Sequence, residues 1–445
     1  FVSIISKNEW KQNIISQVSK IKNNKNFKIT KVKIYENKNK ILFFKKILIK
    51  LHNIFCLLFK VYFSKKKTFI FNTYLGKFND ILLQLKFKEL PIIFFSYPSY
   101  DVKISKNKRN NILKKKFPGE NRITEVYLKT LFINLPINFL EGFKFVNKYL
   151  EKSFLPKNLK FVFNSNELIV DDYFKLWICR QMGNCKLILS QHGLNYQVLT
   201  EHFPQISTLE VSYLDKIFYW GKNKTKNKIF ENMFMIPNRK LFVKNKKKLI
   251  LVLNQSQPSY HYFDNKEYFL NSFEIKKFIT LLDTKIKNNL IVRLHKINFP
   301  PLTSKKIISL IKSSNHKDQI DIDDGKQNIS KLIINSKLIV YSYPSSGFFE
   351  ALSQNVPVLL LWKNMKYECL KSAFNDFNKL KQKKIVFLNE NELSKFINDN
   401  FDKINIWWND KSLKKIVSNF CDKYCSYEEK QILKIYSKLK TITKI

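Results

Sequence analysis

Short apolar runs alternate with helix-length segments along most of this chain, and this alternation restricts the fold more than any other feature. Buried strands separated by helices form parallel sheets that helices cover on both faces. We therefore predict an α/β fold. The runs expected as strands are 69–72, 91–95, 159–163, 186–189 and 216–219, then 249–253, 290–294, 319–322, 337–341, 358–361 and 384–387.

The length of 445 residues exceeds what one hydrophobic core usually serves, so two domains are expected. The segment 221–248 is rich in Asn and Lys and contains Pro237, which suits an interdomain connection. We predict an N-terminal α/β domain over 1–220, whose first ~130 residues match no recognisable pattern, and a C-terminal α/β domain with terminal helices over 249–445. We therefore expect two Rossmann-like domains that face a cleft. Ligands of such sheets bind where the strands end.

The chain carries 80 Lys and Arg against 35 Asp and Glu, a formal net charge of +45. Such a charge invites a nucleic-acid interpretation. However, Lys, Asn, Ile and Phe are enriched together and the lysines are spread along the chain, as drift in an A+T-rich genome produces. Nucleic acid binding is therefore not expected, and attraction to anionic lipid head groups is the open alternative.

The six cysteines indicate a reducing compartment. They show no CxxC spacing, and the chain has no recognisable secretory signal, so we expect a cytoplasmic protein. Cys421 and Cys425 lie four residues apart on an expected helix. Because no second pair or His completes a metal site, they are interpreted as core residues.

The most apolar early stretch, Ile41 to Phe63, is interrupted by lysines and leaves no run near the ~20 residues that a membrane span needs. We expect an ordinary helix packed in a domain. A basic amphipathic helix lying on a membrane is the alternative. The segment 103–116 is basic with little apolar periodicity, which predicts a mobile loop.

A polar loop follows the strand expected at 186–189 and contains the first candidate site residues. His192 stands where the strand ends, between Gln191 and Gly193. A His in this position can donate to a phosphate or sugar oxygen, or exchange a proton near neutral pH. The alternative is a structural His that caps a turn, and position alone favours neither.

Cationic donors follow the strand expected at 290–294. They are Arg293, His295 and Lys296. Such a cluster suits a diphosphate or phosphodiester, which Arg can bind in bidentate fashion. Because lysines are frequent throughout this chain, a basic cluster alone is weak evidence. The prediction depends mainly on the position of the cluster at the end of a strand.

A helix start follows the strand expected at 337–341. Pro344 breaks the chain path, and Ser345 or Ser346 stands where an N-cap would open the helix. Free N–H groups and the positive dipole end at such a start bind phosphate, although Ser also caps helices without a ligand. Glu350, about one turn further on, could accept hydrogen bonds from a ribose or sugar, or merely favour the helix dipole.

Several motifs, in the same order, resemble transferases encoded in bacterial O-antigen loci over roughly 135–424. That family is more distantly similar to GT-B capsular Kdo and sialic acid transferases and to CDP-glycerol glycerophosphotransferases. The sequence departs from these patterns at Leu194 and Gln197, where the family favours Gly, and at Lys296, where the distant relatives carry Pro. The motifs are Asp171 to Trp177, Gln191 to Tyr196, Glu210 with Asp215 and Trp220–Gly221, Ser345 to Leu352 with Val356–Pro357, and Trp407–Trp408 with Phe420 and Tyr424.

The resemblance implies a GT-B-like fold and a particular way of holding the donor. In the Kdo and sialic acid transferases, a His in a basic loop and a pair of Ser at a helix start contact the phosphate of a cytidine-monophosphate sugar. Carried over by motif, these roles fall on His295 and on Ser345 and Ser346.

The expected function is transfer of a sugar from a nucleotide-activated donor, with a CMP-linked acidic sugar as one candidate, to a glycan or lipid-linked glycan of a surface polysaccharide. His192 is the first candidate for the general base and Glu201 the second. Gln191, Gly193 and Asn195 are expected to shape the loop. The alternatives are a CDP-alditol phosphotransferase of the same fold and a non-catalytic membrane-surface scaffold.

No cofactor and no metal are expected at this site. A DxD-type carboxylate pair does not stand at a strand end, so the donor phosphates are expected to meet Arg293, His295, Lys296 and the Ser346 helix start. The acidic group formed by Asp321, Asp323 and Asp324 is interpreted as a turn and helix cap.

Overall fold

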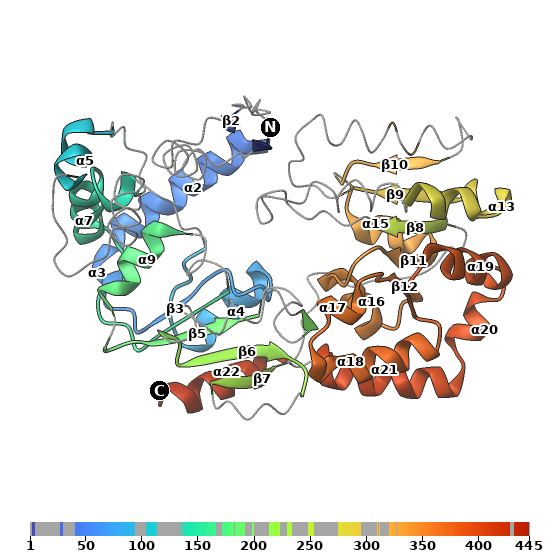
Figure 1. Ribbon diagram of the computed structural model, residues 1–445. Helices are drawn as coiled ribbons and strands as arrows, with labels where there is room; N and C mark the ends of the chain where they lie inside the picture. The colour runs from blue at the N-terminus through green and yellow to red at the C-terminus, as the bar shows by residue number, and fades with distance from the viewer. Residues whose placement is uncertain are drawn as a thin grey trace.

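Two α/β units, each built on a parallel sheet, make up the computed structural model (Figure 1). The predicted fold class is therefore confirmed. A separate parallel pair joins β1 (Val2–Ile4) to β2 (Phe27–Ile29). The structure describes residues 2–4, 27–29, 41–93, 104–113, 135, 137–165, 171–181, 183–191, 198–199, 213–222, 229–233, 248–252, 275–294, 309, 311, 320–325, 327–427 and 431–444.

The N-terminal sheet has the strand order β3-β4-β5-β6-β7, with every pair parallel. Its inner strands are buried along almost their whole length. Helices cover both faces, and this explains why these strands appear in the sequence as continuous apolar runs. The strands are β3 (Thr68–Ile70), β4 (Phe161–Asn164), β5 (Lys186–Ser190), β6 (Lys216–Trp220) and β7 (Phe230–Met233).

Different helices cover the two faces of this sheet. On one face, side chains of α2 (Ile41–Leu58), α3 (Lys60–Ser64), α7 (Phe143–Lys152) and α9 (Asp172–Cys179) pack on the strands. On the other face lie α4 (Lys77–Lys86) and the C-terminal helix α22 (Gln431–Thr443), which pack against each other. Lys186 of β5 donates to the Ile442 carbonyl over 2.6 Å, so the chain end returns to the N-terminal sheet (Figure 1).

The C-terminal sheet has the order β10-β9-β8-β11-β12-β13, again all parallel. Numbered from β8, this is the 3-2-1-4-5-6 order of dinucleotide-binding folds, and the order reverses between β8 and β11. The strands are β8 (Lys248–Val252), β9 (Leu290–Arg293), β10 (Asp321–Asp323), β11 (Ser336–Tyr341), β12 (Val358–Leu361) and β13 (Val386–Phe387).

Helices also cover both faces of the C-terminal sheet. One face packs on the helix at 275–281, α13 (Thr284–Lys287), α19 (Glu390–Asn400) and α20 (Ile404–Trp408). The other packs on α15 (Ile329–Ile334), α16 (Ser346–Ser353), α18 (Lys371–Gln382) and α21 (Lys411–Tyr424), with α17 (Met365–Glu368) after β12.

One hydrophobic cluster continues from one sheet to the other. It contains Ile188 and Phe218 from the N-terminal sheet as well as Ile339 and Val358 from the C-terminal sheet. The two units therefore share buried apolar surface. Among the described helices, none is long and apolar enough to cross a membrane.

Three sequence-based expectations are wrong in their local detail. The segment predicted as a mobile loop contains α5 (Lys106–Leu113), where Arg109 forms a bidentate pair with Glu141. Residues 91–93 of the expected strand 91–95 are not in a strand. Asp323, expected in a turn and cap, is the last residue of β10 instead, and Asp321 begins this strand as the run expected at 319–322 predicted.

The interdomain connection over 221–248 stays a prediction. The structure places β7 inside this segment and assigns it to the N-terminal sheet, whereas β8 begins the C-terminal sheet. The sequence did not predict β7 because Phe230 to Met233 has two adjacent polar residues in its middle and forms no apolar run; the strand lies at the sheet edge, and only its last residue is buried.

Candidate functional site

The ends of β8 and β11 meet at the point where the strand order of the C-terminal sheet reverses. Val252 at the end of β8 is in register with Tyr341 on one side and with Arg293 on the other. Ser342, just past β11, donates its backbone N–H to the Val252 carbonyl over 3.1 Å. Open α/β sheets bind ligands outside their carboxyl ends at such a point. We call Arg293, Tyr343, Ser345, Ser346 and Glu350 the switch-point site.

The start of α16 lies at the switch point. Ser345 is the N-cap, with extended backbone (φ −102°, ψ 161°), and its hydroxyl accepts from the backbone N–H of Phe348 over 3.3 Å. Ser346 is the first helical residue and is partly exposed. A Cβ on Gly347 would lie 2.5 Å from the Tyr341 hydroxyl, so the helix start packs directly against the end of β11. The backbone N–H groups that follow Ser345 are thereby held at the sheet edge.

Glu350 is the fifth residue of α16 and is only 6% exposed. Its Oε1 oxygen is shielded from solvent. A carboxylate in such a position interacts strongly with nearby hydrogen-bond donors because water does not compete. Its predicted role toward a ribose or sugar stays a prediction.

Arg293 at the end of β9 is paired with Asp323 at the end of β10. The Arg293 side chain is 14% exposed and that of Asp323 only 3%. The sequence predicted Arg293 as a ligand group and Asp323 as part of a cap, and did not pair them. A guanidinium has five N–H donors in total, so this pairing still leaves donors for an anion.

Tyr343 connects the switch point with the N-terminal domain. Burial raises the pKa of Tyr343, a hydrogen bond with Ser345 opposes this, and the nearby phenol of Tyr74 adds a smaller upward contribution. Tyr74 belongs to the loop after β3 and has a positive φ of 66°. Loops at the carboxyl ends of the two sheets therefore approach each other here.

The carboxyl edge of the N-terminal sheet has further buried polar groups. Gln191 is 2% exposed, donates its backbone N–H to the Phe218 carbonyl and accepts from the Trp220 N–H over 2.9 Å, so it joins the ends of β5 and β6. Asn164 and Ser190 are fully buried, and their side chains make no hydrogen bond within the described part of the chain. Buried side chains without a hydrogen-bond partner are rare and need a physical explanation. At the end of a strand, one such explanation is a polar ligand that binds there.

A buried carboxyl group that the sequence analysis missed lies at the same edge. Asp80, in the first turn of α4, accepts from the Thr73 hydroxyl and backbone N–H. Burial raises the pKa of Asp80 to about 6, although these hydrogen bonds oppose the shift. A carboxyl that titrates near neutral pH can exchange protons with a substrate. The polar run Asn72–Thr73–Tyr74 after a strand was the available sequence signal.

Six predicted site residues lie outside the described residues: His192, Gly193, Asn195, Glu201, His295 and Lys296. Positions on both sides of His192 are nevertheless placed. Gln191 lies at the end of β5, whereas Val198 accepts from the backbone N–H of Leu370 in the C-terminal domain over 2.8 Å. Within the described residues, no group of three or more His, Cys, Asp and Glu side chains is placed to hold a metal ion.

These features define a protein of two parallel α/β units, whose candidate site lies at the switch point of the C-terminal sheet. The sequence matches the family profile of the LIC12162 family transferases over residues 1–439. The chain belongs to this family and is a transferase. The sequence-based expectation of a transferase is therefore confirmed.

Several solved structures are similar to the chain at low identity. Anabaena HepE, in complex with UDP and glucose, is 9% identical, with 70% of this chain and 84% of that chain covered and a TM-score of 0.42. The wall teichoic acid polymerase TagF is 13% identical, with 68% and 85% covered and a TM-score of 0.36. Acinetobacter baumannii MurG is 8% identical, with 99% and 98% covered and a TM-score of 0.37. No curated protein matches the chain significantly.

Proposed function

We propose that this transferase moves a glycosyl group from a nucleotide-activated sugar to an acceptor glycan. The observation that carries the proposal is the start of α16, which lies at the β8/β11 switch point of a sheet with dinucleotide-binding strand order. Backbone N–H groups at a helix start bind phosphate through their free donors and the helix dipole. A nucleotide sugar supplies such a phosphate beside the bond to be broken.

On the donor side, the phosphate contacts the N–H groups that follow Ser345 and the hydroxyl of Ser346. Arg293 contributes its remaining donors, and His295 and Lys296 continue the cationic run after β9. Glu350 accepts from a ribose or sugar hydroxyl. The motif resemblance supports a CMP-linked acidic sugar as the donor.

On the acceptor side, a base must remove the proton of the attacking hydroxyl. His192 is the first candidate and Glu201 the second, and Asp80 is a third because its raised pKa lies near neutral. The placed residues on either side of His192 support it as the first candidate, because Gln191 directly follows β5 and Val198 accepts from the Leu370 N–H of the C-terminal domain. The acceptor is a glycan or lipid-linked glycan of a surface polysaccharide, and the protein acts in the cytoplasm at the inner face of the membrane.

The proposed two-domain organisation includes an interdomain connection within 221–248. The switch from the N-terminal sheet at β7 to the C-terminal sheet at β8 supports a crossover between these strands. Such a connection would let the domains close on a bound donor.

A thermal-shift screen with CMP, CDP, UDP and GDP tests the donor site. A nucleotide at about 100 times its dissociation constant should stabilise the protein by about 2.7 kcal/mol. Ser346→Ala should weaken the response, whereas Ser353→Ala, at the other end of α16, should leave it unchanged. If none of the four nucleotides shifts the melting temperature, the donor site is wrong. Donor hydrolysis without acceptor then separates an enzyme from a scaffold.

A further inference from the structure

The outer side of helix α2 is apolar and exposed to solvent. Six side chains define this outer face of α2 and the following α3: Leu48, Leu51, Ile54, Phe55, Leu58 and Val61, with exposed fractions from 42% to 78%. Their spacing of three and four residues places neighbours on one side of a helix. Contiguous apolar patches of this kind on a soluble protein usually mark an interaction surface.

The opposite side of the helix pair is attached to the N-terminal domain. Cys56 and Phe63 are fully buried and pack in the cluster that contains Phe69 of β3. His52 Nε2 accepts from the backbone N–H of Ile93 over 3.1 Å. An ordinary surface helix turns its apolar side to the core and its polar side to water. In α2 and α3, only a few inward side chains, such as Cys56 and Phe63, pack on the N-terminal domain. The outer face of this helix pair is apolar as well, although it is exposed.

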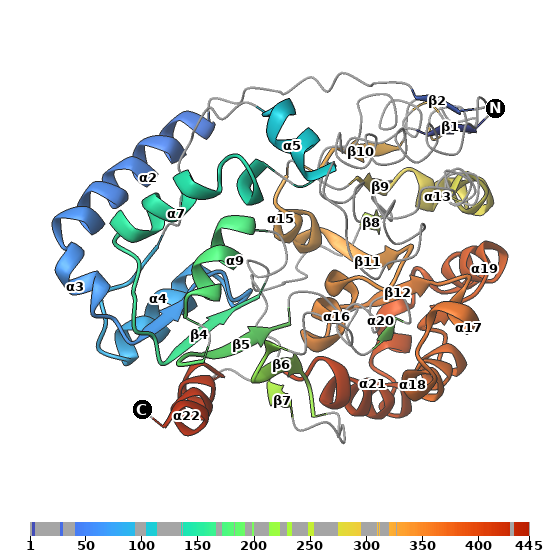
Figure 2. The ribbon, with the colours of Figure 1, turned by 60° about the vertical axis from the view of Figure 1, so that its left-hand side comes forward.

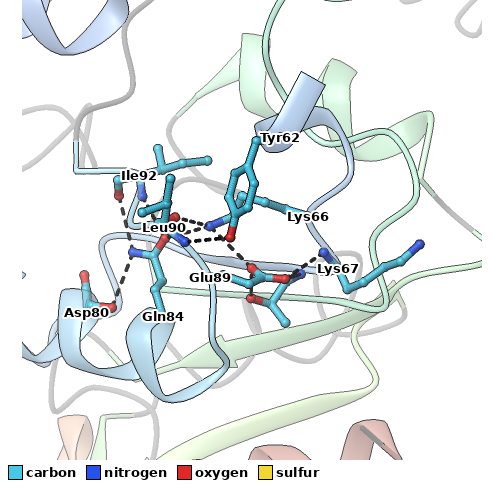
Figure 3. A network of polar contacts seen from close by, with 9 residues as sticks. Tyr62, Lys66, Lys67, Asp80, Gln84, Glu89, Leu90 and Ile92 are labelled. Carbon is cyan, nitrogen blue, oxygen red and sulfur yellow. Dashed lines mark hydrogen bonds and ion pairs between the residues drawn. The ribbon is translucent and has the colours of Figure 1, made fainter. Parts of the chain in front are cut away.

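A buried polar network holds the helix pair in place (Figure 3). Lys66, just after α3, is 3% exposed, donates to the Leu90 carbonyl over 2.5 Å and pairs with Glu89 at 3.3 Å. Tyr62 of α3 accepts from the Leu90 N–H over 3.3 Å. Gln84 of α4 joins the same network through Ile92. The network fixes the helix pair to the N-terminal domain, and α2 runs along one edge of the molecule (Figure 2).

The charge of this region specifies what can cover the outer face. Between Ile41 and Asn79 the sequence contains no Asp or Glu but eight lysines, of which Lys66 is buried in the network described above. Lys65 and Lys67, directly after α3, are exposed. Two copies of so basic a surface would repel each other, whereas anionic lipid head groups attract lysine and their acyl boundary accepts apolar side chains.

We propose that the outer face of α2 binds the surface of an anionic lipid bilayer. The helix lies in the plane of the membrane, its leucines and Phe55 enter the boundary between head groups and acyl chains, and the lysines remain among the head groups. The inference concerns a surface separate from the switch-point site, so it does not depend on the proposed donor.

Co-sedimentation of the full chain with lipid vesicles tests this proposal. Binding should be strong to phosphatidylcholine vesicles that contain phosphatidylglycerol and weak to phosphatidylcholine alone. Leu51→Lys with Leu58→Lys adds two positive charges, so head-group attraction is not reduced, but it removes two apolar contacts of the outer face and should weaken binding at least tenfold. Ile406→Lys is the matched control, because Ile406 is 74% exposed on α20 of the other domain, and it should bind as the original protein does.

The salt dependence provides a second readout. Raising the ionic strength screens the lysines but not the apolar insertion, so part of the binding should persist near 1 M salt. The proposal is overturned if the double variant binds vesicles as well as the original protein does. It is overturned as well if the original protein binds neither vesicle type. It is also overturned if sedimentation velocity shows a dimer that the double variant abolishes. The melting temperatures of the variants and their thermal shifts with nucleotides should equal those of the original protein. A loss of lipid binding then cannot be attributed to unfolding or to a damaged donor site.

Discussion

Arg293 and Asp323 stand side by side in register at the ends of β9 and β10 and form an ion pair. The pair lies next to the switch point, so Arg293 serves the fold as well as the site. Its substitution must therefore be judged by stability and by ligand binding separately.

Arg293→Ala should lower the free energy of unfolding by about 3–5 kcal/mol, because it leaves the buried Asp323 carboxylate without its partner. Urea unfolding measures this. The double variant Arg293→Ala with Asp323→Ala should lose less than Arg293→Ala alone. Additive losses in the double variant would show that the pair is not coupled.

Ser345 and Ser346 should respond differently to replacement by Ala. Ser345→Ala removes the N-cap hydroxyl and should cost about 1 kcal/mol of stability, whereas Ser345→Asn should restore it. Ser346→Ala should cost little stability and act mainly on donor binding. Urea unfolding and nucleotide thermal shifts measure the two effects, and equal stability losses at both positions would contradict the assignment of the cap.

Gly221 occupies a position that only glycine fits. Its φ is +96°, and a Cβ there would lie 2.3 Å from the backbone oxygen of Lys423, which cannot move aside easily. Gly221→Ala should therefore be far more destabilising than Gly183→Ala, where φ is +92° and nothing lies within 4 Å of the added Cβ. Backbone strain alone costs about 1–2 kcal/mol. Similar melting temperatures for the two variants would show that the close approach of Lys423 is unimportant.

Asp80 should make stability depend on pH. Its folded-state pKa of about 6 exceeds the ordinary value of 3.8, so between these values the folded chain keeps a proton that the unfolded chain releases. The contribution of Asp80 to stability is therefore largest below the ordinary pKa and declines as the pH rises to about 6. Relative to Asp80→Asn, the original protein should lose on the order of 3 kcal/mol between pH 4 and 7.5. Urea unfolding across this range measures the difference, and a constant difference would refute the shift.

Much of the element sequence could be predicted because it depends on local pattern. The strands of a parallel sheet covered on both faces are continuous apolar runs, and β4, β5, β6, β8 and β11 were all expected within a few residues of their observed bounds. The helix start near Ser345 follows from Pro344 and the capping chemistry of Ser, which are local as well. The placement of the six undescribed site residues remains a prediction.

Contacts between distant residues decided the rest. Arg109 and Glu141 are 32 residues apart, and their pairing accompanies a helix where the local pattern indicated a loop. The partner of Arg293, the raised pKa of Asp80 and the exposure of the outer face of α2 all depend on what packs around each side chain. The sequence by itself determined which segments become buried strands and helices, because periodicity and capping act within a few residues. Only the tertiary structure decided strand order, charge partners and exposed faces, since these depend on burial and on groups that the chain brings together from far apart.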